Sequence, residues 1–467
     1  MGRSGLRASE LKRLPARFLG IALVAGAWTG VFGSVVDDAI VLEETASPDE
    51  VTACRIELKA SGLYRPPLPP EAMTPDAKMP KPLDVDIQTR MVYRERLLKG
   101  PQRRSLRLVR QAASAINGEV RPAALELRPE LSLLIAERRV PDGAVTVASP
   151  SGSLTRGELE LVESLGDSLC LTDLLPEGPT AQGKSWPIRK SALWALTGYD
   201  AITSTTVEGV IESVADDRVR IGLKGEVKGS VLGAEGTLTC EGWFTFDRKA
   251  GLIDGLELNR TESRQPGAVE AGLDLKSTLT IARRAGIEVP SELSDASLAA
   301  LSPDLTPGRL LLQLIAPDGR YNLLHERNWH IYWDDKKLVV LKRYEKGRVT
   351  AQCNLVYGPP AGKGKHQDVE SFREDVKRAL KGRFSQFLGA GEVEGDPEGG
   401  FRYKLGVQGR QDDLGLLWYY YLIASPRGEQ LLATFTLIDS DAPAFGQEDE
   451  RIIGSLQWND PPLAVGR

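Results

Sequence analysis

The sequence predicts an α+β fold in two parts. The first is an N-terminal antiparallel β-meander, a curved sheet or half-barrel, and the second is a C-terminal antiparallel sheet with helices, an α/β/α sandwich. Apolar and charged residues alternate with a period of two from Leu83 to about Ala285, which is typical of strands with one buried face. Pro290, Pro303 and Pro307 then interrupt the pattern, and the last 150 residues combine aromatic strands with helical segments.

The first 33 residues are typical of a secretory signal peptide. Basic residues precede Phe18, charge is absent from residues 18–36, and Gly33 offers a small-residue cleavage site before Ser34. We therefore predict a secreted or periplasmic, extracytoplasmic protein whose mature chain begins near Ser34. The alternative is an N-terminal membrane anchor, with membrane contact only through residues 18–36, because 19 uncharged residues just suffice for a transmembrane helix.

Charge and length limit the function and the number of domains. Cleavage would remove five positive charges and one negative charge from a net charge of −5, which leaves −9. An acidic chain is a poor binder of phosphate backbones, so we expect no nucleic-acid partner. The remaining length exceeds what one core usually organises. We place a β-rich domain at 34–285, a linker at 286–310 and a second domain at 311–467, which we predict to fold alone.

The cysteines do not predict a disulfide scaffold or a metal site. There are only four, and none lies at a C-x-x-C spacing. They are Cys54, Cys170, Cys240 and Cys353. One pair could bridge outside the cytoplasm, but Cys240 lies on the apolar face of an expected strand and fits a small buried hydrophobic residue equally well. The pairing therefore stays open, and packing must hold the fold.

In the first domain, one strand candidate precedes a proline-dense connector at 65–82. Such a segment favours an extended surface linker over a proline-rich ligand for a partner. The clearest alternation buries Val219, Ile221, Leu223 and Val227, and short Asp/Gly turns such as 247–251 indicate an antiparallel meander. The expected strands include 51–61, 218–228, 238–246, 256–258 and 273–281. Short helices are expected at 155–162 and 188–196.

The second domain is expected to contain four strands, a helix, three long strands and a closing helix. The first four strands are placed at 321–324, 328–333, 337–343 and 350–357. The helix at 368–381 has Phe372 and Val376 on one face and Gly382 at its end. The run 416–423 is apolar on both faces and must be covered on both sides, in part by a closing helix that contains Phe445 and Ile453.

This order of elements over residues 319–458, which ends in Ile453-Gly454-Ser455-Leu456-Gln457-Trp458, resembles the PsbP/Mog1-like α/β/α sandwich. That family includes photosystem extrinsic subunits, a Ran-binding protein and exported bacterial proteins of unknown role. The resemblance implies a fold and no functional residue. The segment 183–186, Gly-Lys-Ser-Trp, followed by a meander, resembles the curved antiparallel sheets of periplasmic lipoprotein-carrier-like domains.

Residues 178–185 match the phosphate-loop pattern G-x-x-x-x-G-K-S. Pro179 removes one backbone donor, and Pro187 falls in the first turn of the helix that should follow. We interpret the segment as a turn that leads into Trp186.

Metal-binding motifs are incomplete. His325-Glu326 begins a zinc-protease signature, but His330 follows five residues after His325 and the only other histidine is His366. The doublets 216–217 and 334–335 are expected in turns, and Asp439-Ser440-Asp441 lacks the glycine of a calcium loop. The aromatic run 418–421 alternates between faces and is interpreted as core packing.

We therefore predict no catalytic, cofactor-binding or metal-binding residues and no cofactor. The expected function is that of an exported, non-enzymatic binding or envelope-associated protein, whose partner is an apolar ligand or another protein. One alternative is a hydrolase with carboxylates that the sequence does not reveal, and another is a scaffold that recruits a partner through its proline-rich segment. The meander is expected to curve around an apolar surface that includes Phe244, unless the sheet closes on itself or packs against the second domain.

Overall fold

A computed structural model describes residues 39–45, 47–66, 80–100, 102–120, 123–139, 143–163, 165–393 and 400–459. The expected signal peptide, the alternative anchor and most of the connector at 65–82 lie outside these residues. The described residues belong to one unit that begins at Ala39. No helix among the described residues is long and apolar enough to cross a membrane.

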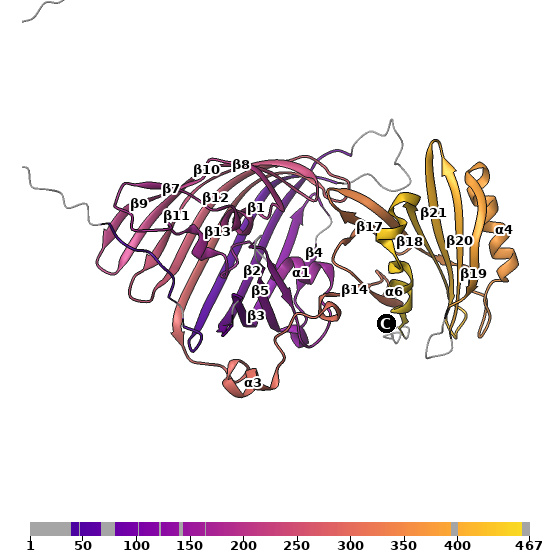
Figure 1. The fold of residues 1–467 in the computed structure, drawn as a ribbon, viewed down its shortest axis with the longest axis horizontal. Coiled ribbons are helices and arrows are strands. Elements are labelled where there is room, and N and C mark those ends of the chain that lie inside the picture. The colour runs from indigo at the N-terminus through magenta and orange to yellow at the C-terminus, as the bar shows by residue number, and fades with distance from the viewer. Residues whose placement is uncertain are drawn as a thin grey trace, which may run out of the picture. The chain divides into compact units, whose positions relative to one another are not determined.

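A 13-stranded antiparallel sheet holds the strands between residues 51 and 287 (Figure 1). Its main path is β6-β5-β3-β2-β1-β13-β12-β11-β10-β9-β7, with β4 beside β3 and β8 beside β10. The strands on the β1 side are β1 (Val51–Arg65), β2 (Leu83–Leu98), β3 (Arg104–Gly118), β4 (Ala123–Glu126), β5 (Leu133–Arg138) and β6 (Val145–Ala148). The others are β7 (Ser185–Pro187), β8 (Ala201–Thr205), β9 (Glu208–Ala215), β10 (Arg218–Val231), β11 (Ala234–Asp247), β12 (Leu252–Arg264) and β13 (Gly272–Ile287).

The register of this sheet gathers apolar side chains on one face, which we call the inner face. Ile56 on β1 is paired with Ile281 on β13, which in turn is paired with Leu256 on β12. The row continues through Phe244 on β11 to Ile221 on β10, and all five residues are buried. The predicted α+β class and the meander from β10 to β13 are therefore confirmed.

The segment 149–199 covers most of the inner face. It contains helix α1 (Arg156–Val162), the 3-10 helix η3 (Leu171–Leu174) and helix α2 (Lys190–Thr197), and all three contribute to one core with the strands. Phe244 is 0% exposed in this core, so the expectation that it lies on an open apolar surface is wrong. The sequence prediction counted only the two α-helices as cover and missed Leu169, Leu171 and Leu174.

The expected linker at 286–310 contains short helices: η4 (Ser291–Leu293), α3 (Asp295–Ala300) and η5 (Pro307–Leu310). Leu293 is 0% exposed and belongs to a small core with Val51, Leu106 and Ile135 of the large sheet. This linker segment therefore packs on the sheet.

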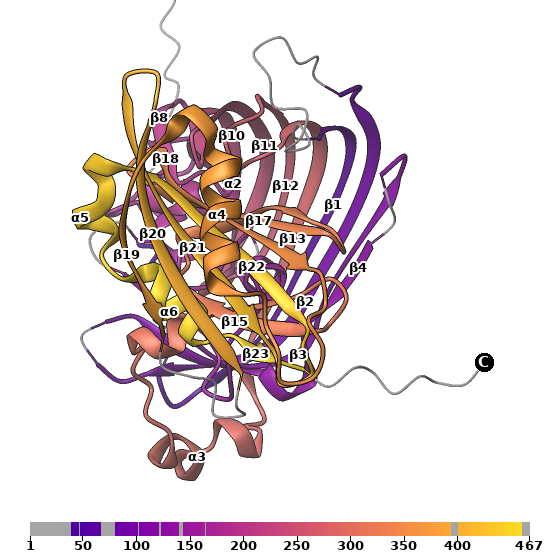
Figure 2. The same ribbon diagram turned by 90° about the vertical axis from the view of Figure 1, so that its right-hand side faces the viewer.

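The C-terminal region contains a seven-stranded antiparallel sheet in the order β16-β17-β18-β22-β21-β20-β19 and a three-stranded sheet, β14-β15-β23 (Figure 2). The seven strands are β16 (Trp329–Asp334), β17 (Leu338–Glu345), β18 (Arg348–Gly358), β19 (Phe384–Glu392), β20 (Phe401–Gln411), β21 (Leu414–Ala424) and β22 (Gln430–Ile438). The small sheet consists of β14 (Leu312–Ile315), β15 (Tyr321–His325) and β23 (Gln457–Trp458). The two predicted aromatic strands, now β15 and β16, thus belong to different sheets.

Helices cover both faces of the seven-stranded sheet, as the apolar strand β21 requires. Trp418 and Leu422 pack in one core with helix α4 (Val369–Leu380). Tyr421 and Ile423 pack in another core with helices α5 (Ala442–Phe445) and α6 (Glu448–Gly454). The expected closing helix is thus divided in two, and Gly446 between the two parts has a positive φ of 58°.

Candidate ligand-binding site

Helix α1 is fixed firmly at its N-terminus. The Oγ1 of Thr155 accepts a hydrogen bond from the N–H of Glu158 at 3.2 Å, and the Glu158 carboxylate accepts one from the N–H of Thr155 at 2.8 Å, which forms a capping box. Arg128 donates two further bonds to the buried carboxylate of Glu158, at 2.7 and 2.8 Å. The helix therefore has a defined position against the sheet although it is only seven residues long.

Contacts with the C-terminal region hold the same helix. The N–H of Gln313 donates to the carbonyl of Leu154 at 2.8 Å. The guanidinium of Arg156 donates to the carbonyl oxygens of Arg327 and Trp329, the latter at 2.9 Å. The guanidinium of Arg156 is thereby engaged by backbone carbonyls.

Beside α1 the inner face of the sheet is open. One hollow of about 200 Å³ is lined by apolar side chains of β1, β2 and β13, and a second of about 180 Å³ is lined by residues of β2, β3, β4 and α1. Thr89 and Glu160 line both, and we call the two together the α1 hollow. Its half-buried apolar side chains include Leu58, Ile116 and Leu125. The apolar inner face thus remains accessible at this place.

Two carboxylates also line the α1 hollow. Glu163 accepts a hydrogen bond from Arg327 Nη1 at 2.9 Å. The Glu160 side chain is accessible to solvent, and its carboxylate has no hydrogen bond or ion pair with any other described residue. Desolvation by the surrounding walls raises the pKa of Glu160 above its ordinary value, although the charge of Arg156 opposes this shift.

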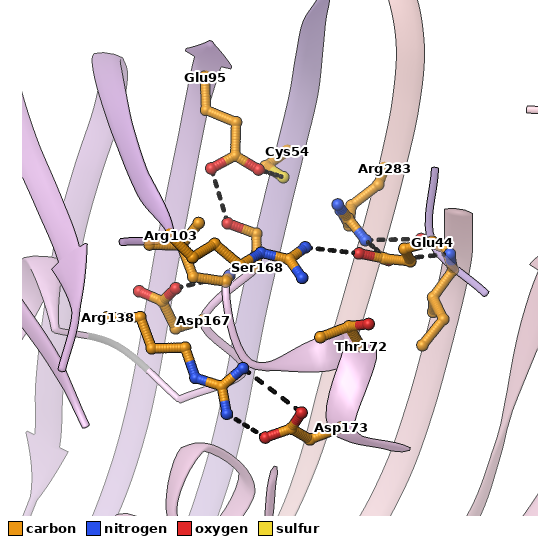
Figure 3. Close-up of polar contacts among 12 residues, drawn as sticks. Glu44, Cys54, Glu95, Arg103, Arg138, Asp167, Ser168, Thr172, Asp173 and Arg283 are labelled. Carbon is orange, nitrogen blue, oxygen red and sulfur yellow. Dashed lines mark hydrogen bonds and ion pairs between the residues drawn. The ribbon is translucent and has the colours of Figure 1, made fainter. Parts of the chain in front are cut away.

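A buried polar network lies elsewhere on the inner face (Figure 3). Arg107 on β3 donates two hydrogen bonds of 2.7 Å to Asp167, in the segment before η3. Ser168 donates to Glu95 on β2 at 2.8 Å and accepts from Tyr93 at 2.9 Å. A cavity of about 10 Å³ beside Glu95 and Ser168 has room for one water molecule.

A second ionic cluster adjoins this network. Figure 3 shows Glu44 between Arg283 and Arg103, and Arg138 beside Asp173. The Glu44 side chain is 0% exposed, and its charge is balanced by the two arginines. These contacts tie residues 39–45 and the segment 167–173 to the sheet.

The geometry of the network does not suit nucleophilic chemistry. Burial, and next the charge of Glu95, raise the pKa of Cys54 to about 12. Burial, and next the charge of Asp167, raise the pKa of Cys170 to about 12. Thiols with such values stay protonated near neutral pH and are poor nucleophiles. Ser168 is 2% exposed, so a substrate has no access to it.

The outer face of the large sheet carries a polar trough of about 1030 Å³. Its lining comes from β1 to β3, β10 to β13 and Thr206, and most of the side chains are charged, hydroxyl-bearing or amide-bearing. They include Lys59, Asp86, Asn259 and Lys276. The trough is therefore unsuited to an apolar group, in contrast to the α1 hollow.

The structure places the sequence motifs in ordinary structural positions. After Gly183, with a φ of 81°, the chain enters strand β7, and helix α2 begins only at Lys190. His325 lies in β15 and His330 in β16, and no group of three or more metal-ligating residues occurs among the described positions. Burial lowers the pKa of both histidines to about 4.

The remaining candidates have structural roles. Asp216 and Asp217 lie in the turn between β9 and β10, and Asp335 accepts hydrogen bonds from the N–H groups of Lys337 and Leu338 in the turn after β16. Asp441 pairs with Arg348. All four cysteines are buried and free. The sequence prediction missed Glu160, because no sequence signal distinguishes it from other charged residues of the expected helix at 155–162.

Comparisons with known proteins assign no family. No protein-family model and no curated protein matches the chain. Cyanobacterial PsbP (CyanoP) from Synechocystis aligns at 16% identity over 32% of this chain and 92% of its own, with a TM-score of 0.25. A protein from Bacteroides thetaiotaomicron aligns at 10% identity over 32% of this chain, with a TM-score of 0.24.

This chain spans only 48% of the Bacteroides protein. OccK2 from Pseudomonas aeruginosa aligns at 10% identity over 83% of this chain and 98% of its own, with a TM-score of 0.12. The PsbP alignment is a weak fold-level resemblance over about a third of the chain, consistent with the PsbP-like resemblance suspected from the sequence. These likenesses carry no statement about function.

Proposed function

We propose that the chain is an extracytoplasmic, non-enzymatic binding protein that holds an apolar group of its ligand in the α1 hollow. The observation that carries this proposal is the opening in the inner face beside α1. Elsewhere that face is sealed by a core in which residues such as Phe244 are fully buried. At α1, by contrast, Leu58, Ile116 and Leu125 line accessible hollows.

The size of the hollows supports a small apolar group. An engineered apolar cavity of about 150 Å³ takes up benzene. The two hollows, at about 200 and 180 Å³, are each somewhat larger. Covering their half-buried apolar walls removes hydrocarbon surface from water, which stabilises a complex by about 25 cal/mol per Å².

Binding of n-alkanols of increasing length to the full chain, measured by calorimetry, tests this function. While the alkyl chain extends within the hollow, affinity should rise about fourfold per methylene, because each buried methylene contributes about 0.8 kcal/mol. Beyond the length of the hollow, affinity should level off.

Two substitutions on β2 locate the site. Thr89→Phe places a ring in both parts of the hollow and should abolish alkanol binding. Gln88→Phe, on the opposite face of the same strand, should leave it unchanged. Circular dichroism checks that both variants are folded. Alkanol binding that does not depend on chain length, or that persists in folded Thr89→Phe, would refute the proposal.

A further inference from the structure

We infer that the ligand of the α1 hollow carries a protonated primary amine beside its apolar group, and that Glu160 binds this amine. The inference rests on the function proposed above. It follows from the carboxylate of Glu160, which lines both parts of the hollow and has no ion-pair partner among the described residues.

The other charged side chains near α1 already have partners. Glu158 is bound by Arg128, and Glu163 is bound by Arg327. Arg156, four residues before Glu160, would be the usual helical partner, but its guanidinium donates to the carbonyls of Arg327 and Trp329. Among the described residues, the Glu160 carboxylate therefore has a neighbouring positive charge, that of Arg156, but no ion pair or hydrogen bond.

The surroundings of Glu160 favour a cation that arrives with an apolar group. Its carboxylate lines a hollow with Leu58 and Leu125, so its ionised form loses part of its hydration there while the side chain stays accessible to water. An ammonium group in the hollow would restore a charge-assisted hydrogen bond in surroundings that screen charge less than water does. An anionic group would instead meet both Glu160 and Glu163, so an acidic amphiphile is disfavoured.

Two hydroxyl groups complete the polar part of the site. Thr89 Oγ1 and Ser114 Oγ lie 2.9 Å apart on adjacent strands, and both side chains line, with Glu160, the part of the hollow that is formed by β2, β3, β4 and α1. A primary ammonium has three donors. The Glu160 carboxylate and the two hydroxyl oxygens offer acceptors for all three, whereas an alcohol has a single donor and no charge.

The test compares hexylamine with 1-hexanol on the full chain at about pH 8, where amine and carboxylate are both charged. The wild-type chain should bind hexylamine about tenfold more tightly than 1-hexanol, because a charge-assisted bond replaces a neutral one. Glu160→Gln should bring the two affinities within about twofold. Glu126→Gln removes the same charge from an exposed position on β4 outside the lining of the hollow and should keep the tenfold preference.

A charge-reversal variant distinguishes the loss of a specific charge interaction from a general weakening of the fold. Folded Glu160→Lys should prefer hexanoate over 1-hexanol, because the sign of the bound charge is then inverted. Equal binding of hexylamine and 1-hexanol to the wild type would overturn the amine inference and leave the apolar site standing. A preference for hexylamine that persists in Glu160→Gln would overturn the inference in the same way. Absence of binding for both compounds would overturn the proposed function together with the inference.

Discussion

Replacement of Asp167 by asparagine should destabilise the large sheet by about 3 kcal/mol. Two hydrogen bonds of 2.7 Å join Asp167 to Arg107, whose side chain is only 1% exposed. Removal of one partner of a buried ion pair costs about 3–5 kcal/mol, because the other charge stays buried. Glu95 Oε2, 3.5 Å from Arg107 Nε, retains a negative charge beside the guanidinium, so we expect the lower end of this range.

Urea unfolding followed by circular dichroism measures this loss. Glu241→Gln provides the matched control, because Glu241 pairs with Lys224 on the surface, where the side chains are 71% and 75% exposed. Exposed pairs contribute about 0–1 kcal/mol, so the control should unfold almost as the wild type does. A loss below about 1 kcal/mol for Asp167→Asn would refute the assignment of a stabilising role to the network.

The same pair predicts a dependence on pH. Burial by itself would raise the pKa of Asp167, but the charge and hydrogen bonds of Arg107 and the N–H of Leu169 outweigh burial and lower it. A lowered folded-state pKa contributes stability above the unfolded-state value, near 3.9, and that contribution is lost as the pH falls through the folded-state value. The difference in stability between wild type and Asp167→Asn should therefore shrink below about pH 4.

Four further outcomes are expected. Phe244→Ala should reduce the free energy of unfolding by about 3–5 kcal/mol, measured by urea titration, since Phe244 is 0% exposed; a loss below about 1 kcal/mol would contradict its place in a sealed core. A thiol reagent should label no cysteine in the native chain and all four after denaturation, because every thiol is buried, and rapid native labelling would contradict this burial. Amino-terminal sequencing of protein from its source should begin near Ser34, and a sequence starting at Met1 would disprove cleavage. The fragment 311–467 should give dispersed amide resonances, and a collapsed NMR spectrum would show that it needs the rest of the chain.

Local patterns predicted local structure well. The period-two alternation around Val219 and Leu238 identified β10 and β11, and helix α1 begins one residue after the expected Thr155 because that residue is its N-cap. The pairing of β1 with β13 could not be predicted, since it joins residues more than 200 positions apart. The cover supplied by Leu169 and Leu171 was missed for a related reason: 3-10 turns and loops show no helical period.

The α1 hollow could not be predicted from the sequence either, because it is formed by residues that are distant in the chain. Residues of five strands and one helix line it, and no single segment contains a pattern that indicates an opening. In the sequence, Glu160 is indistinguishable from an ordinary helical surface residue. Its position in the hollow is set by the position of helix α1. That position depends on Arg128, which contacts Glu158 from 30 positions earlier in the chain, and on Gln313, which donates a hydrogen bond to Leu154. Such coupling between distant residues is a property of the folded chain.

The central place of β1 has a consequence for how the chain acquires its structure during synthesis. β1 is paired with β13, and the outermost pairs of this ladder are Val51 with Ile287 and Arg65 with Gly272. At a synthesis rate of about 5–20 residues per second, the ribosome completes β13 on the order of 10–45 seconds after β1. During that interval the backbone donors and acceptors of β1 on that side are unpaired, and such an edge invites aggregation. Protection of this nascent edge, by a chaperone or by delayed folding, is therefore a requirement that the topology itself imposes.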